Sequence, residues 1–148
     1  MNNKNYYLFL VITISTILTS CKKEETPSVV PEIAFISVTP LSAKEFSDSL
    51  VFKISYRDND GDLGDNSSNA ENLFLTDSRN NVIYKYRISE LAPQNSGIAI
   101  QGNLLITLQN TSIIDGSNSQ TVIYSIYLKD RAGNTSNTVT SPTVTVTK

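Results

Sequence analysis

The stretch LVFKISYRD, residues 50–58, alternates apolar and polar side chains with a period of two. Successive side chains of a β-strand point to opposite faces, so this alternation predicts a strand with one buried face. The later stretch TVIYSIYLKD, residues 121–130, has the same alternation, and both stretches therefore predict strands that cover a common core. The residues of the first stretch that share the buried face are Leu50, Phe52, Ile54 and Tyr56.

The same alternation continues along the chain from Ile33 onwards and predicts an all-β domain over residues 32–148. No segment has the spacing of an amphipathic helix, and polar turns separate the alternating segments. Short alternating strands at this spacing favour a seven-stranded antiparallel sandwich of the immunoglobulin-like or fibronectin type. The seven predicted strands span residues 32–39, 49–57, 72–76, 81–88, 98–109, 121–129 and 138–147.

Two of these strands contain residues that disturb the pattern. In the strand over residues 98–109, the sequence QGN around Gly102 allows either a hairpin turn or one continuous strand. The apolar residues keep to even positions on both sides of Gly102, which favours the continuous strand. In the last strand, Pro142 lacks an amide hydrogen and predicts an edge position or a bulge.

The composition argues against several functional classes. The chain has 148 residues and 39% hydrophobic residues, which suits one domain with its own core. A net charge of −2 argues against nucleic acid and anionic membrane surfaces as partners. Histidine is absent, there is one cysteine, and five of the fourteen Asp and Glu residues lie in a single loop, residues 58–71. We therefore expect no enzyme, because catalytic groups need to converge in a pocket.

The N-terminal segment predicts export. Lys4 precedes an apolar stretch over residues 6–18, which is shorter than the roughly twenty residues of a membrane-spanning helix. This order of charge and apolar stretch is typical of a signal peptide, here over residues 1–20. Cys21 follows directly, so the segment ends at the one cysteine of the chain.

The four residues LTSC, residues 18–21, resemble the lipobox of bacterial lipoproteins. The resemblance implies cleavage before Cys21, a diacylglyceryl group on its thiol, and a further acyl chain such as palmitate on the new amino terminus. Two or more acyl chains anchor a protein stably to a membrane. The alternative is an ordinary secretory signal in which the cysteine is incidental.

Residues 21–31 are expected to form a flexible tether, because they are polar and contain Pro27 and Pro31. Within them, KKEE at residues 22–25 resembles the export signal of Bacteroidetes-type surface lipoproteins. We therefore expect a lipid-anchored protein of the outer membrane. Its domain lies either on the cell surface or on the periplasmic side of that membrane.

The segment DRAGN, residues 130–134, resembles a turn of bacterial immunoglobulin-like extracellular domains. Together with the DxDGDxG loop at residues 58–64, it makes the chain similar to small single-domain lipoproteins of Bacteroidetes, a group mostly without assigned activity. We expect a non-catalytic cell-envelope domain that serves adhesion, scaffolding or accessory binding of a protein ligand. The alternative is a glycan-binding module of an outer-membrane uptake system. Tyr127, which is out of phase with its strand's core face, would then be exposed for sugar stacking.

The segment YRDNDGDLGDN, residues 56–66, predicts a calcium site. Carboxylates at alternate positions can converge on one ion as the chain turns, and oxygen ligands outside the cell favour Ca²⁺. Four predicted strands, an even number, separate this loop from the 130–136 turn, so both are expected at the same end of the sandwich. The alternative is a solvated acidic turn. The predicted ligands are Asp58, Asp60 and Asp62, completed by Asp130 and Asn134, with Asp65 and Glu71 as further candidates.

Overall fold

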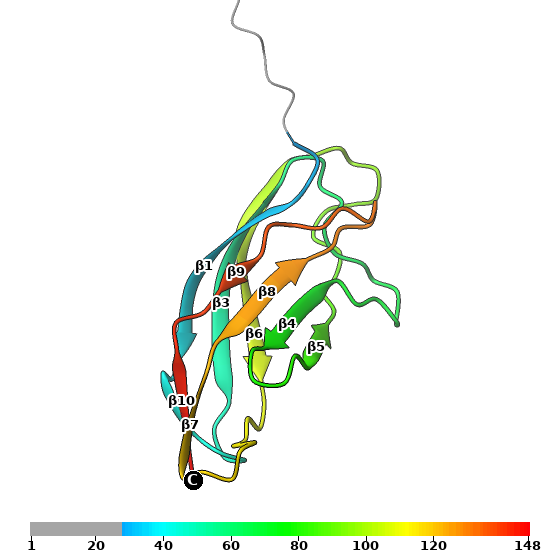
Figure 1. Cartoon of the computed structure of the whole chain (residues 1–148). Helices are drawn as coiled ribbons and strands as arrows, with labels where there is room; N and C mark the ends of the chain where they lie inside the picture. The colour runs from blue at the N-terminus through cyan, green and yellow to red at the C-terminus, as the bar shows by residue number, and fades with distance from the viewer. Residues whose placement is uncertain (1–27) are drawn as a thin grey trace, which may run out of the picture.

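The structure is a computed structural model that describes residues 28–148. The predicted signal peptide, the predicted lipidation site Cys21 and most of the predicted tether lie outside the described residues. The described segment is all-β, as predicted, and contains no helix that could cross a membrane. Figure 1 shows the strands running along the length of an elongated domain.

Ten strands form in the described segment. In chain order they are β1 (Glu32–Thr39), β2 (Ser42–Lys44), β3 (Leu50–Asp58), β4 (Leu73–Asp77), β5 (Ile83–Tyr86), β6 (Ile100–Leu108), β7 (Ser119–Val122), β8 (Tyr124–Leu128), β9 (Val139–Thr140) and β10 (Val144–Thr147).

The strands are arranged in three sheets, with the orders β1-β3-β6, β5-β4-β8-β9 and β2-β10-β7. Every paired neighbour is antiparallel except β2 and β10, which run parallel. In Figure 1 the β1-β3-β6 sheet lies behind the sheet that contains β4 and β8, and the small third sheet continues both at the end near the C-terminus.

The number of strands differs from the seven predicted because two predicted strands are interrupted. At Ile123 the backbone N–H and C=O bond Ser78 instead of a strand, so β7 pairs with β10 and β8 pairs with β4. At Pro142 no amide hydrogen is available, and the chain leaves β9 before it enters β10. The additional strand β2 has three residues, which is too short to show an alternating pattern.

The prediction of one continuous strand through Gly102 is confirmed. Strand β6 keeps the same register with β3 from Ile100 opposite Asp58 to Leu108 opposite Leu50. Gly102 lies opposite Tyr56, and a Cβ atom at residue 102 would come within 2.9 Å of the Tyr56 hydroxyl oxygen. The glycine therefore makes room for the tyrosine ring without ending the strand.

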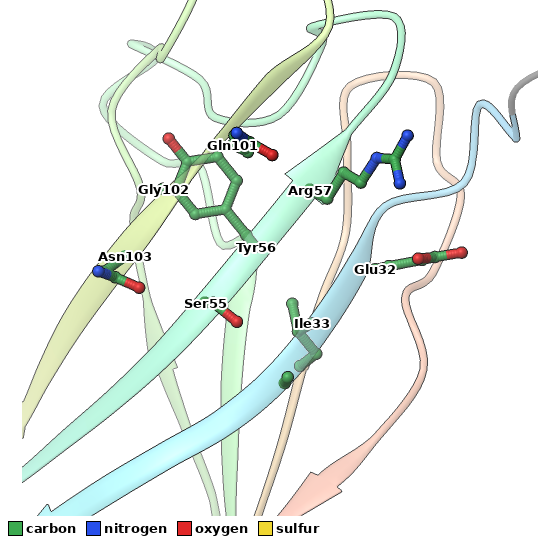
Figure 2. A pocket seen from close by; sticks show the side chains of 9 residues that line it. Glu32, Ile33, Ser55, Tyr56, Arg57, Gln101, Gly102 and Asn103 are labelled. Atoms are coloured by element: carbon green, nitrogen blue, oxygen red, sulfur yellow. The ribbon is translucent and has the colours of Figure 1, made fainter.

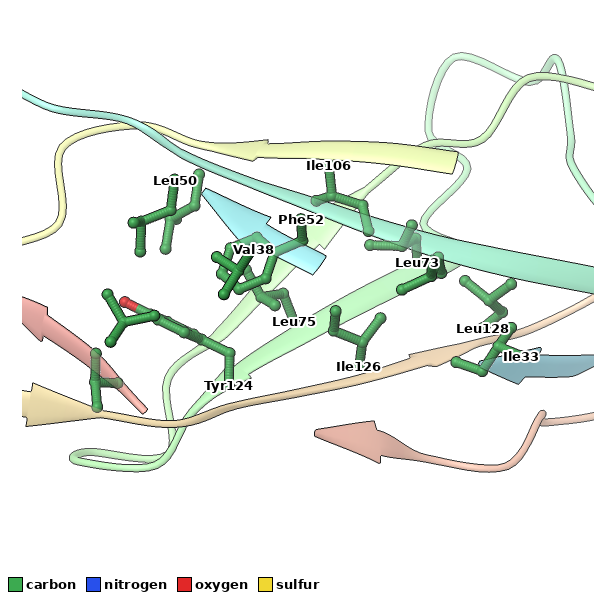
Figure 3. Close-up of a cluster of buried hydrophobic side chains, with 14 of the residues drawn as sticks. Ile33, Val38, Leu50, Phe52, Leu73, Leu75, Ile106, Tyr124, Ile126 and Leu128 are labelled. Atoms are coloured by element: carbon green, nitrogen blue, oxygen red, sulfur yellow. The ribbon is translucent and has the colours of Figure 1, made fainter. Parts of the chain in front are cut away.

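The hydrophobic core lies between the sheets, and the predicted inward faces supply it. Phe52 of β3 meets Tyr124 of β8 edge to face, with ring centroids 5.1 Å apart (Figure 3). Burial of a large apolar side chain stabilises a fold by roughly 1.5–3 kcal/mol. The core extends from Ile33 to Val146, so a segment of roughly 120 residues carries one joined core and is large enough to fold alone. Its fully buried members include Leu50, Phe52, Ile54, Leu75, Tyr124, Ile126, Leu128, Val144 and Val146.

Candidate metal site

The acidic loop after β3 meets the turn after β8, as the strand count predicted. The backbone N–H of Arg131 donates to the carbonyl oxygen of Asp62 at 3.3 Å. The N–H of Ala132 donates to Asp62 Oδ2 at 3.0 Å. These contacts join two segments that are far apart in the sequence, and they fix Asp62 against the DRAGN turn.

The structure brings Asp58, Asp60 and Asp62 together. Each offers a carboxylate oxygen, and these oxygens all lie within 4.8 Å of one another. Asp58 is completely buried, and its Oδ2 accepts a hydrogen bond from the N–H of Leu63 at 2.9 Å. The Oδ1 atoms of all three aspartates are buried, and no group in residues 28–148 donates a hydrogen bond to them. Buried acceptors normally have partners, so these three oxygens are ready to bind something further.

Two glycines shape the loop around the carboxylates. Gly61 and Gly64 have φ angles of 73° and 90°, in the left-handed region that glycine adopts without strain. A Cβ atom on Gly61 would overlap the carbonyl oxygen of Ile98, and one on Gly64 would overlap that of Ser89. The loop therefore packs directly against the segment that precedes β6, and this packing holds the aspartates in place.

Burial and mutual repulsion raise the pKa of two of these aspartates. The pKa of Asp58 rises from 3.8 to about 6, chiefly because burial disfavours its charge and also because Asp60 and Asp62 lie beside it. The N–H of Leu63 opposes this rise. Burial likewise raises the pKa of Asp62, with the charges of Asp130 and Asp60 adding to the effect. Without a cation, the cluster therefore resists being fully ionised.

Arg131 is a residue of the candidate site that the sequence did not predict. Its guanidinium donates to the carbonyl oxygens of Gly64 at 2.7 Å and Gly61 at 3.3 Å. Glu90 also lies beside it, with Oε1 3.7 Å from Arg131 Nη1. Arg131 lowers the pKa of Asp62, yet its hydrogen bonds go to the loop backbone and not to the three free Oδ1 atoms. The sequence feature that could have indicated Arg131 is its place inside the DRAGN turn. The motif accepts any residue at this position, so it does not predict an arginine there.

Asp130 lies near Asp62 and is bonded to Asn134, and neither Asp130 nor Asn134 belongs to the group of three converging carboxylates. Asp130 Oδ1 accepts from the backbone N–H of Asn134 at 2.7 Å, and Oδ2 accepts from Asn134 Nδ2 at 2.9 Å. Asp130 is buried, and its charge acts on Asp62. Both carboxylate oxygens of Asp130 thus stabilise the DRAGN turn, and this turn contacts the acidic loop at Asp62.

Asp65 and Glu71 lie outside the group of three. Asp65 Oδ1 accepts from the backbone N–H of Ser67 at 2.8 Å, and this hydrogen bond lowers the pKa of Asp65. Glu71 Oε2 pairs with Lys85 Nζ at 2.7 Å on the surface. The structure therefore does not bring these two further candidates to the converging carboxylates.

A hollow of about 450 Å³ adjoins the cluster on its solvent side. Asp60 and Asp62 line it together with Asn95, Gly97 and the Arg131–Ala132 segment. An ion could enter through this hollow, and water could reach it there. The arrangement thus combines buried protein oxygens on one side with open coordination positions on the other.

A second hollow lies on the β1-β3-β6 sheet (Figure 2). It measures about 520 Å³, and its polar lining includes Glu32, Arg57, Gln101 and Asn103. Tyr127, which was expected to be exposed for sugar stacking, is half-buried and stacks on Phe74 with ring centroids 4.7 Å apart. Its ring face towards Phe74 is thus occupied within the domain.

Comparison of the chain with protein families, with curated proteins and with solved structures found no match. The function proposed below therefore rests on the three converging carboxylates and on the motifs of the sequence.

Proposed function

We propose that the protein is a lipid-anchored, non-catalytic domain of the bacterial cell envelope that carries a structural calcium site. The observation that supports the metal site is the set of three Oδ1 atoms of Asp58, Asp60 and Asp62. These atoms are buried and accept no hydrogen bond from the described residues, and each of the three residues offers a carboxylate oxygen within 4.8 Å of those of the other two.

Calcium fits this set of donors better than other ions. All three are carboxylate oxygens, which select a hard cation. Ca²⁺ accepts six to eight oxygen ligands in flexible geometry, so water in the hollow beside Asp60 can complete the coordination. Mg²⁺ demands near-ideal octahedral geometry and keeps several waters, which fits a half-buried carboxylate cluster less well.

The bound ion would act by joining strand ends. Asp58 is the last residue of β3, whereas Asp62 is bonded to Ala132 in the turn after β8. An ion held by both aspartates therefore links the β1-β3-β6 sheet to the sheet that contains β8. It also neutralises the repulsion that raises the pKa of Asp58.

The calcium proposal is tested by unfolding residues 28–148 in millimolar Ca²⁺ and in EDTA. A ligand that binds only the folded state stabilises it by roughly 1–3 kcal/mol when its free concentration is ten to a hundred times its Kd. We expect a higher melting temperature in calcium for the wild type and no difference for the double variant Asp60→Asn, Asp62→Asn. The matched control is Asp65→Asn, Glu71→Gln, which removes two acidic groups nearby and should respond to calcium like the wild type. Equal wild-type melting temperatures in both buffers would refute the site.

We further infer that the fold is an immunoglobulin-like or fibronectin-type sandwich. The support is that β2 follows β1 closely, β7 and β8 are separated by one residue, and β9 and β10 flank Pro142. Counting each pair as one interrupted strand gives the seven strands of such a domain. The layers are then β1-β3-β6 against β5-β4-β8-β9.

The lipid anchor remains a proposal from the sequence of residues 18–21. Expression of the full chain in a bacterium, followed by Triton X-114 partition, tests it. We expect the wild type in the detergent phase and Cys21→Ala in the aqueous phase. Separation of inner and outer membranes would then locate the anchored protein, which we place in the outer membrane. A Cys21→Ala variant that stays in the detergent phase at the wild-type level would contradict the anchor.

Glycan binding is a second candidate function, favoured by the hollow in Figure 2. Glu32, Arg57, Gln101 and Asn103 offer both donors and acceptors there, as sugar hydroxyls require. A glycan array with residues 28–148 tests it, and binding lost in Arg57→Ala would place the sugar in this hollow. An array without any bound glycan would exclude this candidate.

A further inference from the structure

Strand β6 forms one edge of the β1-β3-β6 sheet, and no strand of the described residues pairs with its outer side. The Thr107 carbonyl oxygen accepts a hydrogen bond from the Tyr86 hydroxyl at 3.3 Å, on the side away from β3. Because backbone groups alternate in direction along a strand, those of Gln101, Asn103 and Leu105 also point away from β3. No group in residues 28–148 bonds their N–H or C=O.

The opposite edge of this sheet is protected. The side-chain amide of Asn137 accepts from the N–H of Ile33 and donates to its carbonyl oxygen, both at 2.8 Å. Asn137 thus replaces a neighbouring strand at β1, which also carries Glu32. Proteins commonly shield sheet edges in such ways, because a bare edge can pair with another chain.

The other edges are short or charged. Strand β5 has four residues including Lys85, β2 has three including Lys44, and β9 has two. By contrast, β6 has nine residues, and residues 91–114 contain no Asp, Glu, Lys or Arg. Among the described edges, β6 therefore combines length with an absence of charge, the two features that favour strand pairing.

Apolar surface accompanies this bare edge. Leu105 is 70% exposed on the outer face of β6. A groove of about 440 Å³ runs beside the strand, between β6 and the segment after β5, and is lined by Leu91, Leu104 and Tyr86 among others. A strand added to β6 would cover Leu105 and part of this groove, which adds apolar burial to the hydrogen bonds.

We propose that β6 pairs antiparallel with β6 of a second copy of this chain, with the two-fold axis near Asn103. The free outer groups of Gln101, Asn103 and Leu105 are centred on Asn103, so each copy offers the other the same donors and acceptors. Strand β6 itself carries no charge, so no like charges meet along it when two copies pair, although Arg87 lines the groove beside it. A charged partner strand would find no opposite charge on residues 91–114.

The test is sedimentation velocity of residues 28–148 over a concentration series from about 1 µM to about 1 mM. We expect the wild type to shift from one chain to two. We expect Leu105→Lys to remain a single chain, because each copy then carries a charge in place of the apolar surface that pairing would bury. Phe46→Lys is the matched control, since Phe46 is also 70% exposed but lies in the loop after β2, where its N–H is bonded to Thr111 beyond the end of β6. This variant should dimerise like the wild type. A wild type that stays monomeric over the whole series, or an equal loss in both variants, would overturn the proposal.

Amide hydrogen exchange separates edge pairing from other contacts. At high concentration, the amides of Gln101, Asn103 and Leu105 should become protected, whereas those of Gly102 and Leu104 are bonded to β3 and should be protected at every concentration. A second variant, Asn103→Pro, removes an outer N–H without removing a bond to β3, and it should remain monomeric. Dimers that leave the three outer amides as exposed as in the monomer would also overturn the proposal.

Discussion

Two buried aspartates at the ends of strands have different partners in this fold. Asp77 ends β4 and Asp58 ends β3, and both are completely buried. Asp77 is paired with Arg79, whose Nη2 lies 2.6 Å from Asp77 Oδ2 and whose Nε lies 3.0 Å from Oδ1. Asp58 instead receives one backbone hydrogen bond and faces two further aspartates.

The difference is whether the charge of the buried carboxylate is matched by a cationic side chain of the same fold. Arg79 also donates to the carbonyl oxygen of Ser112 at 2.7 Å and to Gln120 Oε1 at 3.2 Å, so the Asp77 charge is matched within the chain. At the acidic cluster, Arg131 lies near Asp62 but donates its hydrogen bonds to the carbonyl oxygens of Gly61 and Gly64. The acidic cluster thus lacks the cation that the fold supplies at Asp77.

The largest loss of stability is expected from removing the positive charge of Arg79. Arg79→Met leaves Asp77 buried without a counter-charge, and breaking a buried ion pair on one side costs about 3–5 kcal/mol. Arg79 and Asp77 have side chains that are 8% and 0% exposed, so solvent does not replace the lost partner. Urea unfolding of the variant measures the loss.

The control for this prediction is the double variant Asp77→Asn, Arg79→Met, which leaves no unpaired charge and should recover part of the lost stability. If Arg79→Met loses less than about 1 kcal/mol of unfolding free energy, the range of exposed ion pairs, then Asp77 does not depend on its counter-charge. The contrast between Asp77 and Asp58 would then be wrong.

A smaller, pH-dependent effect is expected at the other aspartate. The folded-state pKa of Asp58 is raised from 3.8 to about 6, so the protonated form is favoured in the metal-free fold. This contribution to stability is fully present below pH 3.8 and is lost as the pH rises through about 6. In EDTA, the wild type should therefore lose stability relative to Asp58→Asn between pH 4 and pH 8, by up to about 3 kcal/mol.

Urea unfolding of both proteins at several pH values in this range measures the difference. The Asn side chain does not titrate, which makes it the reference for Asp58. A difference that stays constant with pH would mean that Asp58 is ionised in the metal-free fold throughout, against the raised pKa.

The smallest change in stability is expected at a solvent-exposed ion pair. Lys85 and Glu71 lie 2.7 Å apart, but their side chains are 48% and 52% exposed. Lys85→Met should leave the unfolding midpoint within error of the wild type, because solvent and salt screen exposed pairs. If its loss matched that of Arg79→Met, burial would not be what separates the ion pairs of this fold.

The parts of the fold that follow from local pattern could be predicted from the sequence. Leu50, Phe52 and Ile54 alternate with polar neighbours and are buried as expected. The convergence of Asp58, Asp60 and Asp62 was also predictable, because their spacing and Gly61 act within one loop.

The parts that depend on distant partners could not be predicted. The break at Ile123 exists because Ser78 bonds its backbone, and β2 is defined by its pairing with β10. Arg131 reaches the loop carbonyls through a turn whose motif does not specify that position. The bond between Asp130 and Asn134 likewise follows from the turn geometry, which spacing alone did not reveal.

The most direct measurement is a crystal structure of residues 28–148 grown with calcium, with an anomalous map recorded at long wavelength. The proposal predicts one calcium peak at about 2.3–2.6 Å from the Oδ1 atoms of Asp58, Asp60 and Asp62, with water completing the shell from the side of Asn95 and Gly97. Three aspartates without an anomalous peak between them, in a crystal grown with calcium in excess, would contradict it.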